Sequence, residues 1–253
     1  MAASRAEGAR VSSPAPWFSH DGGQFDGAEP LFYDAAAFDW AGRVEAEWRG
    51  VRDELAALLN DRGARLLPYP NQALSDAPER WTTFALLFWL HELRHNIARC
   101  PFTWQLLKDI PGLSSVSFSL MAPGTAIKAH RGDTNAIMRC HLGLDIPAPA
   151  PECALQVGDA VRGWQEGTFT MFCDAHEHSA WNHTQAHRYI LIIDVVRPPF
   201  VARRAAIARR VVAAVLSDLC CQRLAWLRPA RRMVFGLLHS RRLAGRFLNR
   251  ITR

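Results

Sequence analysis

Residues 130–147 read HRGDTNAIMRCHLGLDIP, and a later segment at 172–198, FCDAHEHSAWNHTQAHRYILIIDVVRP, repeats their layout. In both, a histidine is followed about ten residues later by an arginine that begins an alternating apolar run. Two imidazoles can hold a divalent metal ion, and two guanidinium groups can hold the two carboxylates of a diacid. The two segments therefore predict one enzyme site, for which the rest of the chain serves as scaffold, lid or anchor.

Short β-rich segments surround these two stretches and are separated by Pro-Gly, Gly-Asp and Glu-Gly turns. They lie at 115–121, 125–131, 137–146, 154–157, 160–164, 168–172 and 189–196. Seven or eight strands in about 85 residues are typical of an antiparallel sandwich or barrel.

Helices are predicted before this β-rich region. Apolar residues recur at helical spacing between residues 40 and 60, which indicates one amphipathic helix. A strand is expected at 82–88, a loop or short helix at 91–100, and a helix at 101–110 that begins at Pro101. The expected organisation is a flexible N-terminus at 1–28, a domain at 29–200 with its β core at about 113–198, and a helical extension at 201–253.

Charge is unevenly distributed between the body and the last 53 residues. The whole chain carries +6, but residues 201–253 contain thirteen Arg and one acid, Asp218, which gives +12 there and −6 for the rest. This tail is either a helical cap with solvated arginines or a basic amphipathic helix on anionic lipid. Nucleic acid is not an expected partner, because aromatic residues do not interleave with the basic ones.

Cysteine usage and hydropathy bear on the compartment. The six cysteines (Cys100, Cys140, Cys153, Cys173, Cys220 and Cys221) form no CxxC pair, which is typical of reduced thiols. The start, MAASRAEGAR, has no apolar signal region, and no apolar run reaches about 18 residues. The expectation is a cytoplasmic protein, with peripheral contact at the inner face of the membrane if the tail binds lipid.

His130 is the first candidate metal ligand. A lone histidine near a strand end is more often structural, but His178 follows 48 residues later, and the intervening strands can return the chain to the same barrel mouth. Two neutral imidazoles on a β scaffold suit Fe(II), which commonly takes a carboxylate as its third protein ligand. The position two residues after His130 is Gly132, and Asp133 would point to the opposite face of an extended strand.

The motifs SLMAPGT, HRGDTN, MRCHLGLDIP, EHSAW and HRYILIIDVVRP resemble those of the aspartyl/asparaginyl β-hydroxylase family of iron- and 2-oxoglutarate-dependent dioxygenases. The shared stretch covers roughly residues 115–198. The resemblance implies a mainly β fold with flanking helices, built on a double-stranded β-helix (jelly-roll, cupin-like) core. It also implies Fe(II) held by His130 and His178, with water completing the coordination where Gly132 replaces a carboxylate.

By the same resemblance, Arg188 with Ser119 is expected to grip the distal carboxylate of 2-oxoglutarate, and Arg139 with His141 to contact its chelating end. Arg139 and His141 are two apart, so on a strand they share a face. An arginine inside a barrel needs an anion. The alternative for either arginine is a salt bridge to Asp194 or Asp174.

Four further residues lie close to the second histidine in the sequence. Trp181 and Asn182 follow His178 and are assigned to the substrate mouth, although Trp181 also suits core packing. His176 and His183 flank the same histidine and are interpreted as surface or supporting residues.

The implied activity hydroxylates an unactivated carbon, with 2-oxoglutarate and O2 consumed as cosubstrates and CO2 and succinate released. The first substrate hypothesis is an aspartyl or asparaginyl side chain in a peptide, or a small acid. The alternative is a lipid A-type fatty acyl group at a membrane surface, which the Arg-rich tail favours. A catalytically silent β-helix binding protein is the hypothesis from another class, and the retained histidines and arginines count against it.

Overall fold

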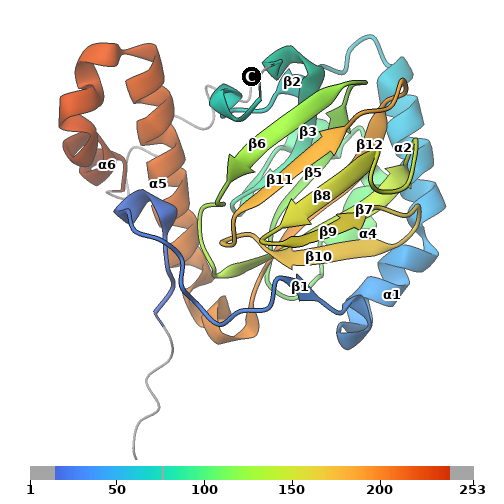
Figure 1. Cartoon of the computed structure of the whole chain (residues 1–253), viewed down its shortest axis with the longest axis horizontal. Helices are drawn as coiled ribbons and strands as arrows, with labels where there is room; N and C mark the ends of the chain where they lie inside the picture. The colour runs from blue at the N-terminus through green and yellow to red at the C-terminus, as the bar shows by residue number, and fades with distance from the viewer. Residues whose placement is uncertain (1–14, 76, 240–253) are drawn as a thin grey trace, which may run out of the picture.

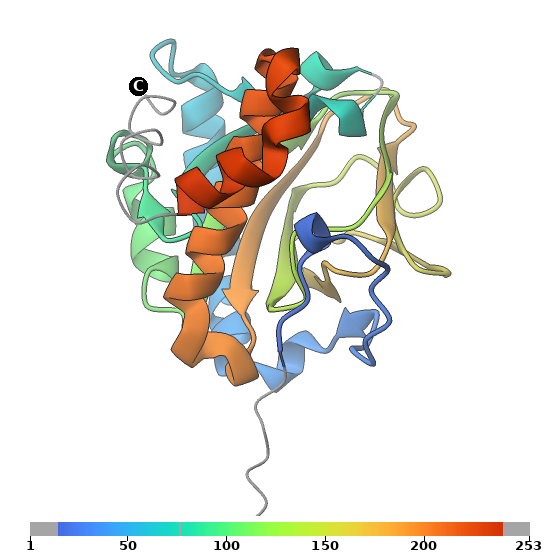
Figure 2. The same ribbon diagram turned by 90° about the vertical axis from the view of Figure 1, so that its left-hand side faces the viewer.

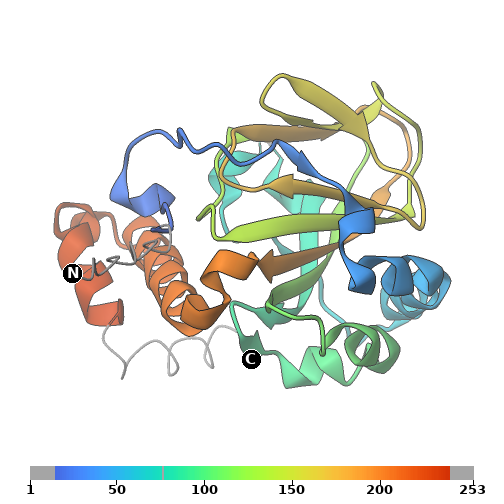
Figure 3. The same ribbon diagram turned by 90° about the horizontal axis from the view of Figure 1, so that it is seen from below.

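A computed structural model describes residues 15–75 and 77–239 of the chain. Its centre is two facing antiparallel sheets (Figures 1 and 3). The first sheet has the strand order β1-β10-β7-β12-β5-β3-β2, with β4 paired to β3, and the second has the order β6-β11-β8-β9. The strand bounds are β1 Phe32–Tyr33, β2 Leu67–Pro68, β3 Trp81–Phe88, β4 His91–Glu92, β5 Leu113–Met121, β6 Thr125–His130, β7 Ile137–Asp145, β8 Cys153–Val157, β9 Ala160–Gly163, β10 Phe169–Cys173, β11 His178–Asn182 and β12 Arg188–Val196.

The chain alternates between the two sheets from β5 onward. β5, β7, β10 and β12 lie in the first sheet, whereas β6, the β8–β9 hairpin and β11 lie in the second. This alternation defines a double-stranded β-helix, so the predicted fold class is confirmed. Strand β11 was not predicted, because its sequence HSAWN lacks a clean apolar alternation, yet it pairs with both β6 and β8.

The two faces of the first sheet have different surroundings. On β7, Met138, Cys140 and Leu142 pack beneath helices α1 (Asp39–Ala46), α2 (Trp48–Asn60) and α4 (Pro101–Leu107) on the sheet's outer side (Figure 3). The intervening Arg139 and His141 face the interior between the sheets, as their spacing predicts.

The helices differ in detail from the expectation. The single helix predicted at 40–60 is two, because Glu47 leaves helical geometry between α1 and α2. The short helix α3 (Arg94–Ile97) falls within 91–100, and α4 ends at Leu107, a few residues before the predicted end.

The described part of the C-terminal extension, up to His239, folds into a helical hairpin at the end of the sheets (Figure 2), and residues 240–253 lie outside the described chain. It comprises the 3-10 helix η5 (Pro198–Arg203), α5 (Arg204–Arg223), the 3-10 helix η6 (Ala225–Ala230) and α6 (Arg231–His239). Helix α5 buries Ile207, Val211 and Leu216 in one cluster with residues of β7 and β12. The packing of α5 on the body agrees with the helical cap that the sequence offered as one alternative for the tail. Among the described helices, none is both long and apolar enough to cross a bilayer.

Residues 15–28 pack against the body, which differs from the loose segment predicted for 1–28; residues 1–14 lie outside the described chain. The Trp17 backbone N–H donates to Asn135 Oδ1 over 2.8 Å, and Thr134 Oγ1 donates to Trp17 O. Farther along, Arg210 of α5 pairs with Asp21 at 2.6 Å. These partners are more than 100 residues away, so local composition gave no sign of them. Five of the six cysteines are buried, and Cys220 is half-buried.

Candidate active site

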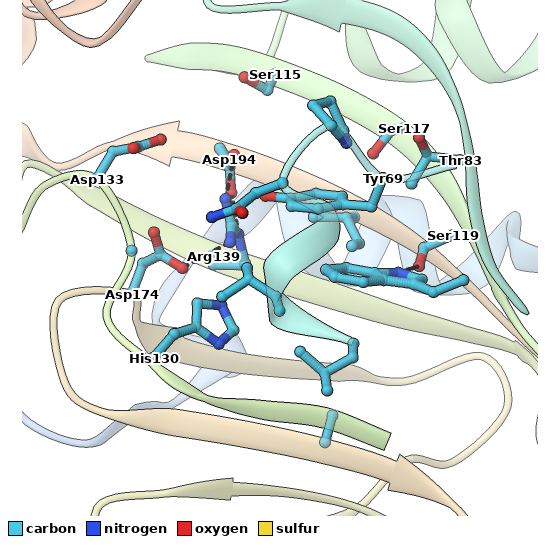
Figure 4. A pocket seen from close by; sticks show the side chains of 18 of the residues that line it. Tyr69, Thr83, Ser115, Ser117, Ser119, His130, Asp133, Arg139, Asp174 and Asp194 are labelled. Atoms are coloured by element: carbon cyan, nitrogen blue, oxygen red, sulfur yellow. Dashed lines mark hydrogen bonds and ion pairs between the residues drawn. The ribbon is translucent and has the colours of Figure 1, made fainter. Parts of the chain in front are cut away.

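A pocket between the sheets brings together the two segments highlighted by the sequence. Its walls come from β3, β5, β7 and β12 of the first sheet, β6 and β11 of the second, and helix α5. His130, His141, His178, Arg139 and Arg188 all line it. Figure 4 shows part of this lining, with Ser115, Ser117 and Ser119 along β5.

The two predicted ligand histidines face each other at this pocket. His130 ends β6 and His178 begins β11, and the two residues are directly paired across the strands. Their ring centroids are 4.2 Å apart. Each Nδ1 lies against a carbonyl oxygen, His130 on Lys128 O at 2.8 Å and His178 on His176 O at 2.9 Å. Because a carbonyl only accepts, each Nδ1 carries the proton and each Nε2 lone pair is left free.

Burial also keeps both rings neutral. Desolvation lowers the pKa of His130, and it lowers the pKa of His178 well below 6.5 with a further contribution from His130 itself. Neutral imidazoles with a carbonyl on Nδ1 have the tautomer that metal-binding histidines use. In the part of the chain that the structure describes, no third His, Cys, Asp or Glu joins them in a metal-binding group.

A carboxylate fills the space beside Gly132. The Gly132 N–H donates to Asp174 O over 2.7 Å, and a Cβ built at residue 132 would collide with the Asp174 carboxylate. Asp174 is fully buried, and its Oδ1 lies 3.7 Å from His178 Nε2. Sequence reasoning considered Asp133 as the nearby carboxylate and named Asp174 only as a salt-bridge partner. The close approach of residues 132 and 174 requires glycine.

We call Arg139, Asp174 and Asp194 the paired end of the pocket. The Arg139 guanidinium contacts Asp194 through Nε at 2.8 Å and Nη2 at 3.0 Å, and its Nη1 lies 2.7 Å from Asp174 (Figure 4). Burial disfavours the cation, but Asp174 and Asp194 outweigh burial and raise the pKa of Arg139. The alternative of a salt bridge therefore describes Arg139, and its role toward a cosubstrate stays a prediction.

We call Arg188, Ser119, His141 and Trp164 the open end. Arg188 is 2% exposed, and its Nε and Nη1 have no hydrogen-bond partner among the described residues. The guanidinium lies over the Trp164 ring, 4.8 Å from the centroid. Burial lowers the pKa of Arg188 to about 10. A buried cation without an anion is costly, so this arrangement suits a carboxylate ligand.

Two other polar groups of the open end have hydrogen-bond donors that no protein acceptor engages in the described chain. Trp164 Nε1 donates to His141 Nδ1 over 3.2 Å, which puts the His141 proton on Nε2, and that atom has no partner within the described chain. Burial, followed by Arg139 and Arg188, lowers the pKa of His141 well below 6.5. Ser119 Oγ accepts from Trp81 Nε1 at 3.1 Å, which leaves its own hydroxyl proton available.

The two residues assigned to the substrate mouth lie elsewhere, which corrects that prediction. Asn182 is fully buried and donates to the carbonyls of Met121 and Ala186, so it holds a turn together. Trp181 donates to Pro151 O and stacks on His183. Neither lines the pocket. Ala180 lines the pocket, so strand alternation turns its neighbour Trp181 outward, whereas Asn182 is engaged by the carbonyls of the turn.

Sequence reasoning missed other lining residues. Trp164 was treated only as the end of a predicted strand, and the stacked pair Tyr69 and Trp81, 3.9 Å between centroids, was not singled out. Nor was α5 expected to contribute Val215 and Leu219 to the pocket. The only available signal was the high tryptophan content, nine in 253 residues, which does not say which ring faces a ligand.

Comparison with known proteins shows which family this fold and pocket belong to. The strand topology and the pocket define a double-stranded β-helix with a buried basic site. The family model described as Aspartyl/Asparaginyl beta-hydroxylase matches residues 45–198, well over half the chain. The chain belongs to this family of hydroxylases, so the predicted resemblance is confirmed.

Individual relatives differ in their described substrates. The chain is 40% identical over 174 residues to the ornithine lipid ester-linked acyl 2-hydroxylase of Rhizobium tropici, covering 67% of this chain and 61% of that protein. It is 32% identical over 163 residues to human aspartyl/asparaginyl beta-hydroxylase, covering 61% of this chain and 21% of that protein. The chain thus spans less than two thirds of either relative. A solved prolyl-4-hydroxylase from Pseudomonas putida aligns over 58% of this chain and 86% of that chain, with a TM-score of 0.38 and 16% identity.

Proposed function

We propose that this protein is an Fe(II)- and 2-oxoglutarate-dependent hydroxylase. The observation that carries the proposal is the unpaired, buried Arg188 in the same pocket as two histidines whose Nε2 atoms are free. A dicarboxylate and a divalent metal are the two ligands that these groups lack. Family membership supports the same cofactors.

The residues present fit both groups. His130 and His178 would hold the metal through their Nε2 atoms, because each Nδ1 is already engaged by a carbonyl. Arg188, with the Ser119 hydroxyl, would bind the distal carboxylate of 2-oxoglutarate, and the free Nε2–H of His141 would donate to another cosubstrate oxygen. When bound, iron and 2-oxoglutarate supply the oxidation of an unactivated C–H bond by O2.

The paired end would orient the metal site without binding the cosubstrate. Arg139 is occupied by two carboxylates, so it fixes the Asp174 side chain beside His178. The Asp174 carboxylate, buried beside His178 and able to accept further hydrogen bonds, would supply a fixed acceptor next to the metal-binding histidines. In this account Arg139 is a positioning residue, and Arg188 alone supplies the charge that binds cosubstrate.

For the substrate, we favour a lipid-linked fatty acyl group. The relative with 40% identity is described as acting on an ester-linked acyl chain. An acyl chain also suits the end of the pocket near α5, where Phe88 and Trp89 lie with Val215 and Leu219. This order reverses the one drawn from the sequence, which placed a peptide or small acid first.

An aspartyl or asparaginyl side chain is the second candidate. The row of Ser115 and Ser117 with Thr83 gives the pocket one polar wall that could bind a peptide backbone or a small acid. The human relative, at 32% identity, is described as a hydroxylase of those two residues.

The test has two stages. Purified protein with Fe(II), ascorbate and 2-oxoglutarate is expected to form succinate, His178→Ala to abolish this, and His183→Ala, which changes an exposed neighbouring histidine, to retain it. Incubation with lipid, peptide and metabolite fractions of a cell extract is then expected to add one oxygen atom to a lipid. Equal succinate from wild type and His178→Ala would overturn the hydroxylase proposal, and an oxidised peptide alone would overturn the lipid substrate.

A further inference from the structure

The α5–α6 hairpin exposes an unusual concentration of large apolar side chains. Of the ten such exposed side chains in the described chain, four lie within residues 224–237. Trp226 is 74% exposed, Met233 62% and Leu237 55%, and these are the three highest values. Met233 and Leu237 are four residues apart on α6, so they share one helix face. We call Leu224, Trp226, Met233 and Leu237 the hairpin apolar set.

Positive charge surrounds this set. Arg223, Arg231 and Arg232 are exposed on the same hairpin. The one acid after residue 200, Asp218, is neutralised by Arg231 at 2.7 Å. The sequence after residue 239 adds five more arginines and no acid. An apolar surface with exposed tryptophan and uncompensated arginine is complementary to an anionic bilayer, where aromatic rings enter the headgroup region and guanidinium groups meet phosphates.

The hairpin also forms a wall of the pocket. Val215, Asp218, Leu219 and Gln222 of α5 line the same cavity as the two histidines. Gln222 directly precedes Arg223 and Leu224, so the exposed surface begins where the pocket wall ends. Figures 1 and 2 show α5 next to the sheets and α6 outside it.

We propose that the hairpin docks this protein on an anionic phospholipid bilayer, with the hairpin apolar set inserted between headgroups. The surface of α5 that packs on the body is separate from this set, so α5 acts as a structural cap and the hairpin end acts as the membrane contact. Docking places the pocket beside the bilayer, so a substrate acyl chain has a short path along α5. This consequence rests on the proposed lipid-acyl function, whereas docking itself does not.

The test is vesicle co-sedimentation of the full chain without iron or cosubstrate. Vesicles are pure phosphatidylcholine, or phosphatidylcholine mixed with phosphatidylglycerol. Wild type is expected to bind the anionic vesicles and Trp226→Glu/Met233→Glu to bind them at least about tenfold more weakly, since each removes the insertion of a large apolar side chain. The matched control, Leu67→Glu/Val161→Glu, makes the same changes at exposed positions on β2 and β9 and is expected to bind as wild type does.

A second variant tests the charge. Arg223→Gln/Arg232→Gln is expected to lower affinity for anionic vesicles by roughly tenfold or more and to leave weak binding to neutral vesicles unchanged. Circular dichroism confirms that each variant is folded. No binding by wild type, equal binding to neutral and anionic vesicles, or binding by Trp226→Glu/Met233→Glu equal to the control's would overturn the proposal.

The outcome is independent of the enzymatic one. Vesicle binding without oxidation of any lipid would support docking and contradict the proposed substrate. Oxidation of detergent-dispersed lipid by a protein that does not bind vesicles would support the substrate and contradict docking.

Discussion

Two arginines at opposite ends of one pocket, the half-buried Arg139 and the buried Arg188, have opposite surroundings. Arg139 on β7 touches two carboxylates, whereas Arg188 at the start of the neighbouring strand β12 touches the face of Trp164 and has two nitrogen atoms without partners in the described chain. The pKa of Arg139 is raised and that of Arg188 is lowered to about 10. Residue type alone therefore does not identify a ligand-binding arginine. What distinguishes Arg188 from Arg139 is that no carboxylate of the described chain pairs with it.

The largest expected effect comes from breaking the paired end. Asp194→Asn removes the bidentate partner of Arg139 and leaves a buried charge partly uncompensated. The free energy of unfolding, measured by urea denaturation, is expected to fall by about 3–5 kcal/mol. Glu177→Gln is the control, because it breaks the partly exposed Arg131–Glu177 pair, which is worth at most about 1 kcal/mol. Equal losses in the two variants would contradict the difference in environment.

The open end is expected to respond in the opposite way. Arg188→Met removes a desolvated cation, so the stability of the protein without cosubstrate is expected to stay the same or rise. Affinity for 2-oxoglutarate, measured by calorimetry on the metal-loaded protein, is expected to fall by about 3 kcal/mol, roughly 150-fold. Arg162→Met, at an exposed position on β9, is expected to change neither. A destabilised Arg188→Met that keeps its affinity would mean that this arginine is structural.

The dependence of the free energy of unfolding on pH tests whether the buried His141 imidazole at the open end is neutral. The folded-state pKa of His141 lies well below its ordinary 6.5, because of burial and the nearby arginines. Its stabilising contribution is therefore complete above about pH 6.5 and is lost as the unfolded chain takes up a proton at lower pH. His141→Gln is expected to reduce the slope of unfolding free energy against pH, between about pH 6.5 and 5, by up to about 1.4 kcal/mol per unit. Parallel curves for wild type and variant would contradict the lowered pKa.

The smallest expected effect concerns the ring beneath Arg188. Trp164→Phe keeps an aromatic face but removes the indole N–H that fixes the His141 tautomer. Affinity for 2-oxoglutarate is expected to weaken by about 1 kcal/mol, roughly fivefold. The same calorimetric titration measures it. A loss as large as that of Arg188→Met would show that Trp164, and not the cation, dominates the site.

An antiparallel β sandwich or barrel could be predicted because its determinants are local, whereas the double-stranded β-helix was implied by the family resemblance. Alternating apolar residues and turn pairs mark most strands, and the 48-residue interval between His130 and His178 suits a chain that returns across paired strands. The predicted proximity of the two rings agrees with their 4.2 Å separation. Strand β11 was not predicted, because pairing with β6 and β8 forms it and its own sequence has no strand pattern.

The sequence could not predict that Arg139 is paired with carboxylates while Arg188 is not. This difference depends on where the Asp174 carboxylate goes, and that follows from the close contact with Gly132, more than 40 residues away in sequence. The outward orientation of Trp181 depends on β11, and the α5 wall depends on a helix packing back over the sheets from beyond residue 200. Each is a long-range packing result with no signal within its own segment.

The most direct test of the account is a crystal structure of the protein with Mn(II) and 2-oxoglutarate, with the metal located by its anomalous scattering. The account predicts one metal bound by the Nε2 atoms of His130 and His178, the distal carboxylate on Arg188 and Ser119, and Arg139 still paired with Asp174 and Asp194. A metal bound away from these histidines, or a distal carboxylate on Arg139 with Arg188 left empty, would contradict it.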